Sequence, residues 1–149
     1  MSDDAAFAFG EDPDNPGWHR WQLKDETRYN GFLGKLIIRR EGEIARVRMF
    51  PSRVHTNLQD AIHGGTTLGF IDVALFGASR MFGLIEAGTA ATLDLSTQFI
   101  GPGRIGEPLD AGVELLRETR RLIFMRGLVM QGDHKIAAFS GTIRKGSAG

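Results

Sequence analysis

This chain of 149 residues lacks cysteine, an excess of charge of either sign, and any long apolar run. Without cysteine there can be no disulfide, no thiolate nucleophile and no cysteine-ligated metal. The 18 basic and 18 acidic residues cancel, so no overall field favours nucleic acid or an anionic membrane. No apolar run approaches the roughly 20 residues that a membrane-spanning helix needs. The sequence therefore predicts neither a nucleic-acid partner nor a membrane partner.

The remaining composition is that of an ordinary globular protein, with 42% apolar and 24% charged residues. The chain begins with acidic residues and shows neither the basic nor the apolar region of a signal peptide. We therefore expect one soluble cytoplasmic domain with a proper core. The four histidines show no ligand spacing, so we expect no metal and no cofactor.

Acidic residues, proline and glycine punctuate the first 17 residues, which we interpret as a mobile arm. Trp18 and Trp21 follow. Two tryptophans this close either anchor their segment against the body of the protein or stack on a ligand. We divide the chain into a partly mobile N-terminal extension, the domain itself and a frayed tail, which are residues 1–33, 34–145 and 146–149.

Apolar periodicity predicts two strands, one long helix and then four more strands. The helix is expected from Gly65 to about Gly83; it is apolar nearly all round and should be buried on most faces. Short turns between the strands imply antiparallel neighbours, so we expect an α+β architecture in which the sheet wraps the helix. The predicted strands cover residues 35–39, 44–50, 92–99, 109–116, 122–131 and 136–144.

A single ionisable residue, Asp72, lies in the apolar stretch between Gly64 and Ser79. Burial without partners is costly for a carboxyl group, and it raises the pKa of such a group toward the range useful for acid–base or nucleophilic chemistry. The alternative is a core aspartate bonded to the backbone or to a neighbouring chain. Both interpretations stay open at this point.

Two glycines, Gly64 and Gly65, occupy the expected start of the helix. The first N–H groups of a helix have no partners within it and lie at the positive end of its dipole. Glycine would let a substrate carbonyl approach them, and stabilising the developing oxyanion is worth about 3 to 4 kcal/mol. A tight loop-to-helix turn is the alternative use of the pair.

The spacing of Gly64 and Asp72 limits how they could act together. Eight residues of helix span about 12 Å at 1.5 Å per residue, which is too far for the carboxylate to attack a carbonyl held at the start of its own helix. A catalytic site that uses both residues therefore needs two chains, with Asp72 of one chain near Gly64 of the other.

The spacing of Asn57, five residues, His63-Gly64-Gly65, six residues and Asp72 resembles that of the hotdog-fold acyl-CoA thioesterases of the PaaI-like, phenylacetate-pathway family. The order of predicted elements also resembles that fold, in which a curved antiparallel sheet wraps one long helix. The resemblance covers roughly residues 34–144. It implies a hydrolase that cleaves an acyl-CoA thioester to the free acid and coenzyme A.

The resemblance also implies roles for particular residues. Asp72 would act as general base on water or as nucleophile, and the N–H of Gly64 or Gly65 would polarise the thioester carbonyl. Asn57 would orient the carbonyl or the water, and His63 would shape the same part of the site and form hydrogen bonds there. Thr92, on the strand after the helix, occupies the position of an assisting Ser or Thr in related enzymes.

For coenzyme A, the resemblance points to basic residues near strand turns. Arginine suits phosphate recognition; the alternative is that these are solvated turn charges. Pro102 and Gly103 are candidates for lining the pantetheine channel, and the segment from Trp18 to Phe32 either covers part of the acyl pocket or packs outside the sheet. The arginines near a strand turn that are candidates for binding the phosphates of coenzyme A are Arg117, Arg120 and Arg121.

Two other functions remain alternatives: a hotdog protein that binds acyl groups without turnover, and an enoyl-CoA hydratase or dehydratase that uses His63 and Asp72. The resemblance and the 12 Å spacing both imply at least a homodimer with active sites at its interface. Related proteins pair such dimers into tetramers. The acyl group is left open.

Overall fold

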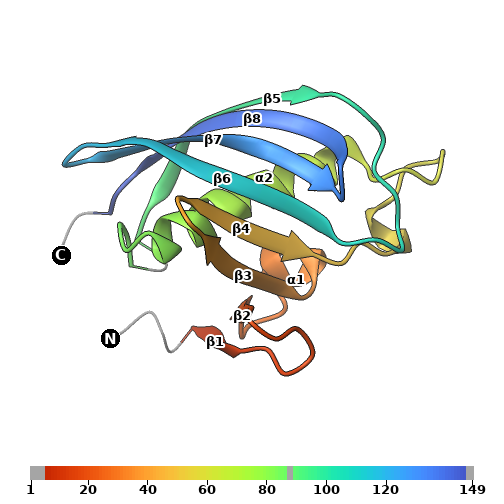
Figure 1. Cartoon of the computed structure of the whole chain (residues 1–149), viewed down its shortest axis with the longest axis horizontal. Coiled ribbons are helices and arrows are strands. Elements are labelled where there is room, and N and C mark those ends of the chain that lie inside the picture. Colours follow the sequence, from red (N-terminus) through yellow and green to blue (C-terminus); the bar gives the residue numbers. More distant parts are fainter. Residues whose placement is uncertain (1–5, 87–88, 147–149) are drawn as a thin grey trace.

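A computed structural model describes residues 6–86 and 89–146 of the chain. Its strands form one antiparallel sheet in the order β1-β2-β3-β4-β6-β7-β8-β5. This sheet curves around the long helix α2 (Figure 1), as predicted. The strands are β1 (Phe7–Glu11), β2 (His19–Leu23), β3 (Leu36–Glu41), β4 (Ile44–Met49), β5 (Ala91–Phe99), β6 (Leu109–Glu118), β7 (Leu122–Gln131) and β8 (His134–Arg144), and the helices are α1 (Tyr29–Leu33), the 3-10 turn η2 (Arg53–His55) and α2 (Gly64–Met81).

Helix α2 fills the concave side of the sheet because most of its side chains are apolar. Ten of its 18 residues are buried, and they pack against the inward-facing residues of the strands, such as Val47 and Val113. The helix begins at Gly64, one residue earlier than predicted, and ends where Gly83 adopts a φ of 74°. Glycine takes this left-handed conformation without strain, which is why it commonly terminates helices.

The N-terminal extension continues the sheet. Instead of an irregular arm, residues 7–11 form β1, which pairs with β2 over five residues; β2 in turn pairs with β3 at His19 and Arg20. Their loop is organised by the buried Asp12, whose carboxylate accepts hydrogen bonds from Asn15 at 2.6 Å and pairs with Lys35 Nζ at 2.8 Å. The irregular arm predicted over residues 1–17 is thus wrong for this strand and its loop; residues 1–5 of that arm, and residues 147–149 of the predicted tail, lie outside the described residues.

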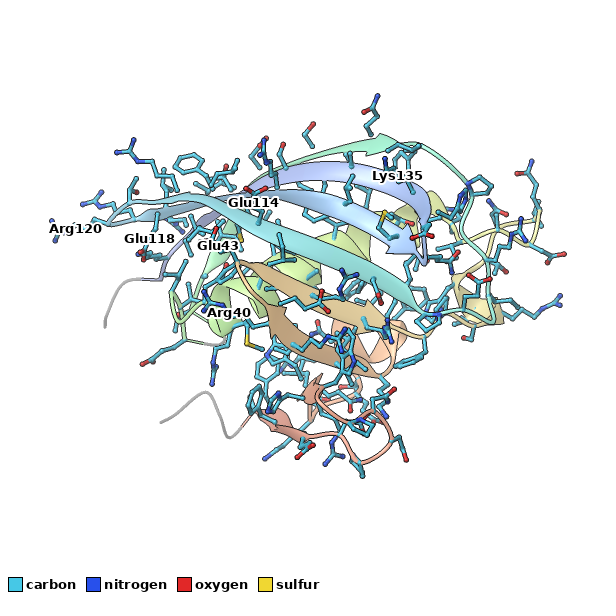
Figure 2. The ribbon with its side chains drawn as sticks, in the orientation of Figure 1. Arg40, Glu43, Glu114, Glu118, Arg120 and Lys135 are labelled. Atoms are coloured by element: carbon cyan, nitrogen blue, oxygen red, sulfur yellow. The ribbon has the colours of Figure 1, made fainter. Side chains whose placement is uncertain are left out.

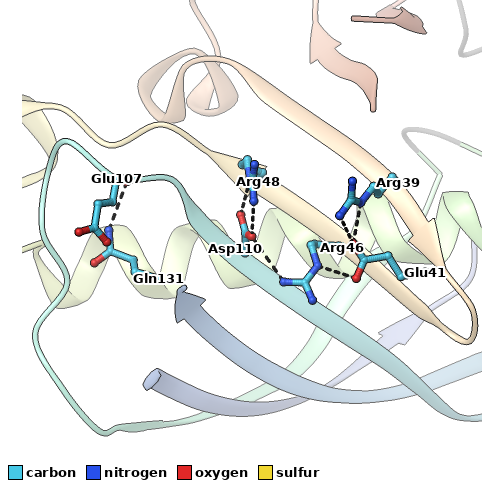
Figure 3. Close-up of polar contacts among 7 residues, drawn as sticks. All are labelled: Arg39, Glu41, Arg46, Arg48, Glu107, Asp110 and Gln131. Carbon is cyan, nitrogen blue, oxygen red and sulfur yellow. Dashed lines mark hydrogen bonds and ion pairs between the residues drawn. The ribbon is translucent and has the colours of Figure 1, made fainter. Parts of the chain in front are cut away.

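Both tryptophans anchor the extension. The guanidinium groups of Arg39 and Arg48 both lie over the Trp18 ring, 4.4 and 4.5 Å from its centre. Arg48 makes two hydrogen bonds to Asp110, at 2.6 and 2.8 Å, within a polar network on the outer face of the sheet (Figure 3). Trp21 belongs to the hydrophobic core. The anchoring interpretation is confirmed.

The loop between β5 and β6 is also fixed by side chains. The amide of Gln131 donates to the backbone oxygen of Arg104 at 2.7 Å and to that of Glu107 at 3.2 Å (Figure 3). This holds the loop beside the start of α2, where Gly103 O accepts a hydrogen bond from the Ile62 N–H at 2.9 Å. Within the described ranges, no helix is long and apolar enough to span a bilayer.

Candidate active site

A hydrogen-bonded pair of side chains joins helix α2 to strand β5. The Thr92 hydroxyl donates to Asp72 Oδ1 at 2.6 Å. The other carboxylate oxygen, Oδ2, has no partner among residues 6–86 and 89–146. The pair therefore presents one oriented carboxylate oxygen that can accept a proton or attack an electrophile.

Asp72 differs from the sequence-based expectation in its exposure. We expected a buried carboxyl in an apolar helix, but Asp72 is only half-buried. Its side chain lines a pocket instead. Ile71, an apolar neighbour that suggested burial, is fully buried and points to another side of the helix, since successive residues are about 100° apart.

The start of α2 carries a second group of polar atoms. His63 is the N-cap residue, and its Nδ1 accepts a hydrogen bond from the Gly65 N–H at 2.8 Å. The Gly64 N–H has no partner in the part of the chain that the structure describes. Of the two glycines, Gly64 is thus the one whose N–H can receive a substrate carbonyl.

The space around the two glycines also indicates Gly64, and not Gly65, as the residue that a substrate can approach. An added Cβ at Gly64 would lie 3.6 Å from the Phe99 ring, an ordinary contact. At Gly65 it would approach the His63 ring to 3.1 Å, so glycine there lets the imidazole cap the helix. Gly64 is therefore not required by packing, which leaves ligand access as a reason for glycine.

Asn57 organises the loop before the helix. Its Oδ1 accepts hydrogen bonds from the backbone N–H groups of Gln59 and Ala61, at 2.9 and 3.2 Å. This turn holds Asp60 at a φ of 59°, a conformation that is uncommon for residues other than glycine. The Asn57 amide nitrogen has no partner among the described residues, so it can still donate to a ligand.

The predicted catalytic residues thus form two groups in one chain. Asn57, His63 and Gly64 lie at the start of α2, whereas Asp72 and Thr92 lie two turns along it. The helix is continuous from Gly64 to Met81, so the separation of about 12 Å predicted from the sequence holds. Neither group is a complete site by itself.

The predicted coenzyme A residues also separate. Pro102 and Gly103 lie near the start of α2, where His134 Nε2 lies 3.0 Å from Pro102 O. Arg120 and Arg121 lie in the β6–β7 turn, and Figure 2 shows Arg120 at the end of the molecule opposite to Lys135. Arg117 lies on β6 opposite Phe124. Within one chain, the arginines do not meet Gly64.

The sequence left open whether the segment from Trp18 to Phe32 covers part of a pocket, and it did not predict the contact of Tyr29 with helix α2. A pocket of about 480 Å³ opens beside Asp72, and Tyr29 and Asn30 of the extension line it together with Phe76 of α2. Burial and the negative charge of Asp72 raise the pKa of Tyr29. The signal that could have indicated this contact is Gly69, a residue without a side chain one turn before Asp72: an added Cβ there would lie within 2 Å of the Tyr29 hydroxyl oxygen.

No group of three or more potential metal ligands occurs within residues 6–86 and 89–146. The described residues supply a carboxylate oriented by a hydroxyl, and an N–H at the positive end of a helix dipole. These are the parts needed for acyl transfer to water.

A family model described as the Thioesterase superfamily matches residues 59–138. This segment includes His63, Gly64, Asp72 and Thr92, and it runs from just before α2 into β8. Among curated protein sequences, none matches.

Several solved structures share this fold. The TT0310 protein of Thermus thermophilus is 25% identical, with a TM-score of 0.64 over 76% of this chain and 92% of that one. The PaaI protein of the E. coli phenylacetic acid degradation operon is 21% identical, with a TM-score of 0.64 over 76% and 80%. Mouse thioesterase superfamily member 2 is 21% identical, with a TM-score of 0.67 over 79% and 87%. The predicted hotdog fold is confirmed.

Proposed function

Because the chain belongs to the Thioesterase superfamily, we propose that it hydrolyses acyl-CoA thioesters to a free carboxylic acid and coenzyme A. The observation that carries this proposal is the Asp72–Thr92 pair, with a hydrogen bond of 2.6 Å. It supplies a fixed carboxylate beside a pocket that can receive an acyl group. A protein that only binds acyl groups would not need this pair.

The proposed reaction begins with a water molecule beside Asp72 Oδ2. The carboxylate takes a proton from the water as the oxygen attacks the thioester carbon. The resulting oxyanion is stabilised by the N–H of Gly64 and the dipole of its helix. When the intermediate collapses, the carbon–sulfur bond breaks and the sulfur of coenzyme A receives the proton from Asp72.

An alternative first step uses Asp72 as a nucleophile. The carboxylate oxygen attacks the thioester carbon directly, the coenzyme A thiolate leaves, and a mixed anhydride forms on Asp72. Water then hydrolyses the anhydride and restores the carboxylate. Thr92 fits either route, because a hydrogen bond to Oδ1 orients the carboxylate and leaves Oδ2 to react.

We infer that the complete site forms between two copies of the chain. Gly64 and Asp72 are too far apart on one helix, so the oxyanion donor and the carboxylate at each site come from different chains. Strand β5 is one end of the sheet order and exposes Leu93 and Phe99 by 55% and 53%. An exposed apolar edge strand favours pairing with a second chain.

Asn57 and His63 would complete the half-site that contains Gly64. Asn57 can donate its amide N–H to the carbonyl or the water, and His63 holds Gly65 so that the loop keeps its shape. The coenzyme A group is proposed to run past Pro102 and Gly103, and its phosphates are proposed to bind the guanidinium groups of the β6–β7 turn, which are those of Arg117, Arg120 and Arg121.

The test is release of free thiol from a panel of acyl-CoAs, followed with a thiol-reactive dye. Asp72→Asn should lower kcat by several orders of magnitude, because it removes the proposed base or nucleophile. Asp133→Asn, the same change in the exposed β7–β8 turn, is the matched control and should leave kcat unchanged. Retained activity in Asp72→Asn would overturn the mechanism; acyl-CoA bound without thiol release would indicate a binding protein.

A further inference from the structure

The pocket beside Asp72 lies between the N-terminal extension and helix α2. Its volume is about 480 Å³, within the range of small-molecule sites. The extension contributes Phe7, Trp21, Leu23 and Tyr29 to the walls. The family model begins only at residue 59, so this half of the pocket lies outside the part of the chain that the family match covers.

The opposite wall is one stripe of helix α2. Asp72, Phe76 and Arg80 line the pocket at spacings of four residues, which place them on one face, and Val73 lines it beside Asp72. This wall therefore begins at the acidic Asp72, continues as valine and phenylalanine, and ends at Arg80. A substrate whose carbonyl lies at Asp72 would extend its acyl group along this wall.

The walls are fixed by close contacts. Phe7 and Trp21 stack with ring centres 5.2 Å apart and planes at 9°. Trp21 lies directly on α2 at Gly77, where an added Cβ would approach the indole ring to 3.0 Å. Tyr29 lies in the same way over Gly69. Two helix positions without side chains thus allow the aromatic residues of the extension to pack close to α2.

From this arrangement we propose that the N-terminal extension forms the acyl pocket of the enzyme, and that the substrate is an acyl-CoA with an apolar acyl group of about six carbons or more. This proposal rests on the proposed thioesterase function and specifies its substrate. A two- or three-carbon acyl group would leave most of the pocket unfilled and lose the dispersion contacts of its walls.

The test measures kcat/KM for straight-chain acyl-CoAs from acetyl-CoA to tetradecanoyl-CoA by thiol release. The value should rise about fourfold with each methylene until the pocket is full. Leu23→Trp fills the pocket, so the rise should stop at a shorter chain. This variant should lose at least tenfold on the best wild-type substrate and less than twofold on acetyl-CoA. Leu128→Trp, on the exposed side of β7, is the control and should keep the wild-type profile.

Gly69→Ala tests the same pocket without weakening the helix, because alanine is the better helix former. Its methyl group displaces the Tyr29 hydroxyl from α2, so long acyl groups should lose at least fivefold in kcat/KM while thermal stability is kept. Unchanged chain-length profiles in Leu23→Trp and Gly69→Ala would overturn the pocket while the thioesterase function stands. Absence of thiol release from every acyl-CoA with the wild type would overturn both proposals.

Discussion

Thr92 donates its hydrogen bond to only one oxygen of Asp72, at 2.6 Å. The two residues lie on different elements, β5 and α2, so the contact fixes the carboxylate relative to the edge strand of the sheet. A β-bulge between Thr92 and Asp94 interrupts the pairing of β5 with β8. Bulges change the direction of side chains at the position where they occur, and this one accompanies a threonine that faces the helix.

Removing the Thr92 hydroxyl should slow the reaction and leave the fold intact. We expect Thr92→Val to lower kcat about 10- to 100-fold, because a hydrogen bond to a charged group contributes about 1.5 to 3 kcal/mol. Thr92→Ser keeps a hydroxyl and should restore most of the activity. The measurement is kcat for the best acyl-CoA substrate, with the melting temperature of each variant.

Thr97, on the same strand, is the matched control for this change. Its hydroxyl oxygen is buried and has no partner within the described ranges. Thr97→Val should therefore leave kcat unchanged and should not lower the melting temperature. Equal loss of activity in both valine variants would mean that β5 tolerates no such change and would contradict a specific role for Thr92.

Gly64→Ala should reduce activity through ligand access and not through stability. The new methyl group would make only an ordinary contact of 3.6 Å with Phe99, but it would stand where the thioester carbonyl approaches the N–H. We expect kcat/KM to fall about 100-fold, as for loss of an oxyanion donor. Gly112→Ala on β6, where the added Cβ would lie 3.5 Å from Ile44, is a control of equal packing and should remain active. Wild-type activity in Gly64→Ala would exclude this N–H as the oxyanion donor.

The ion pair between the buried carboxylate of Asp12 and Lys35 should make the free energy of unfolding of the protein depend on pH. Hydrogen bonds from Lys35 and Asn15 lower the pKa of Asp12 below its ordinary value of 3.8. The stabilisation is therefore fully present above pH 3.8 and is lost as the pH falls through the lower, folded-state pKa. Urea unfolding of the wild type and of Asp12→Asn should differ most near neutral pH and converge in acid. A difference that stays constant down to pH 2 would contradict this pairing.

The structure shows which signals in the sequence were local and which were not. Helix α2 and the strands of the family segment were predicted because apolar periodicity is a property of a few consecutive residues. The structure of the N-terminal extension was not predicted, because β1 is short. The loop after β1 also depends on the ion pair of Asp12 with Lys35, which is more than 20 residues away in the sequence. The acidic residues of this segment suggested a mobile arm, but one of them, Asp12, is the buried carboxylate that organises the loop.

The site shows the same division. The motif indicated Asn57, Gly64, Asp72 and Thr92; the structure shows the hydrogen bond between Thr92 and Asp72, and the catalytic roles of all four stay a prediction. It did not indicate that His63 occupies the Gly65 N–H, nor that Tyr29 lies over Gly69, since both contacts depend on side-chain positions. His55, which no pattern distinguished, is buried; its Nδ1 accepts from the Ser52 N–H, so its Nε2 carries the proton and donates to Phe32 O at 2.7 Å.

Mixing two inactive variants tests whether each site uses two chains. Asp72→Asn and Gly64→Ala damage opposite halves of the proposed site, so each homodimer has two damaged sites. A mixed dimer has one site with both changes and one site with neither. Random exchange makes about half of the dimers mixed, so about a quarter of the wild-type activity per chain should return. The control is a mixture of wild-type and Asp72→Asn chains that is exchanged in the same way. It shows how much activity is lost through the exchange procedure itself. If a single chain supplied both groups, the mixture would stay inactive after exchange.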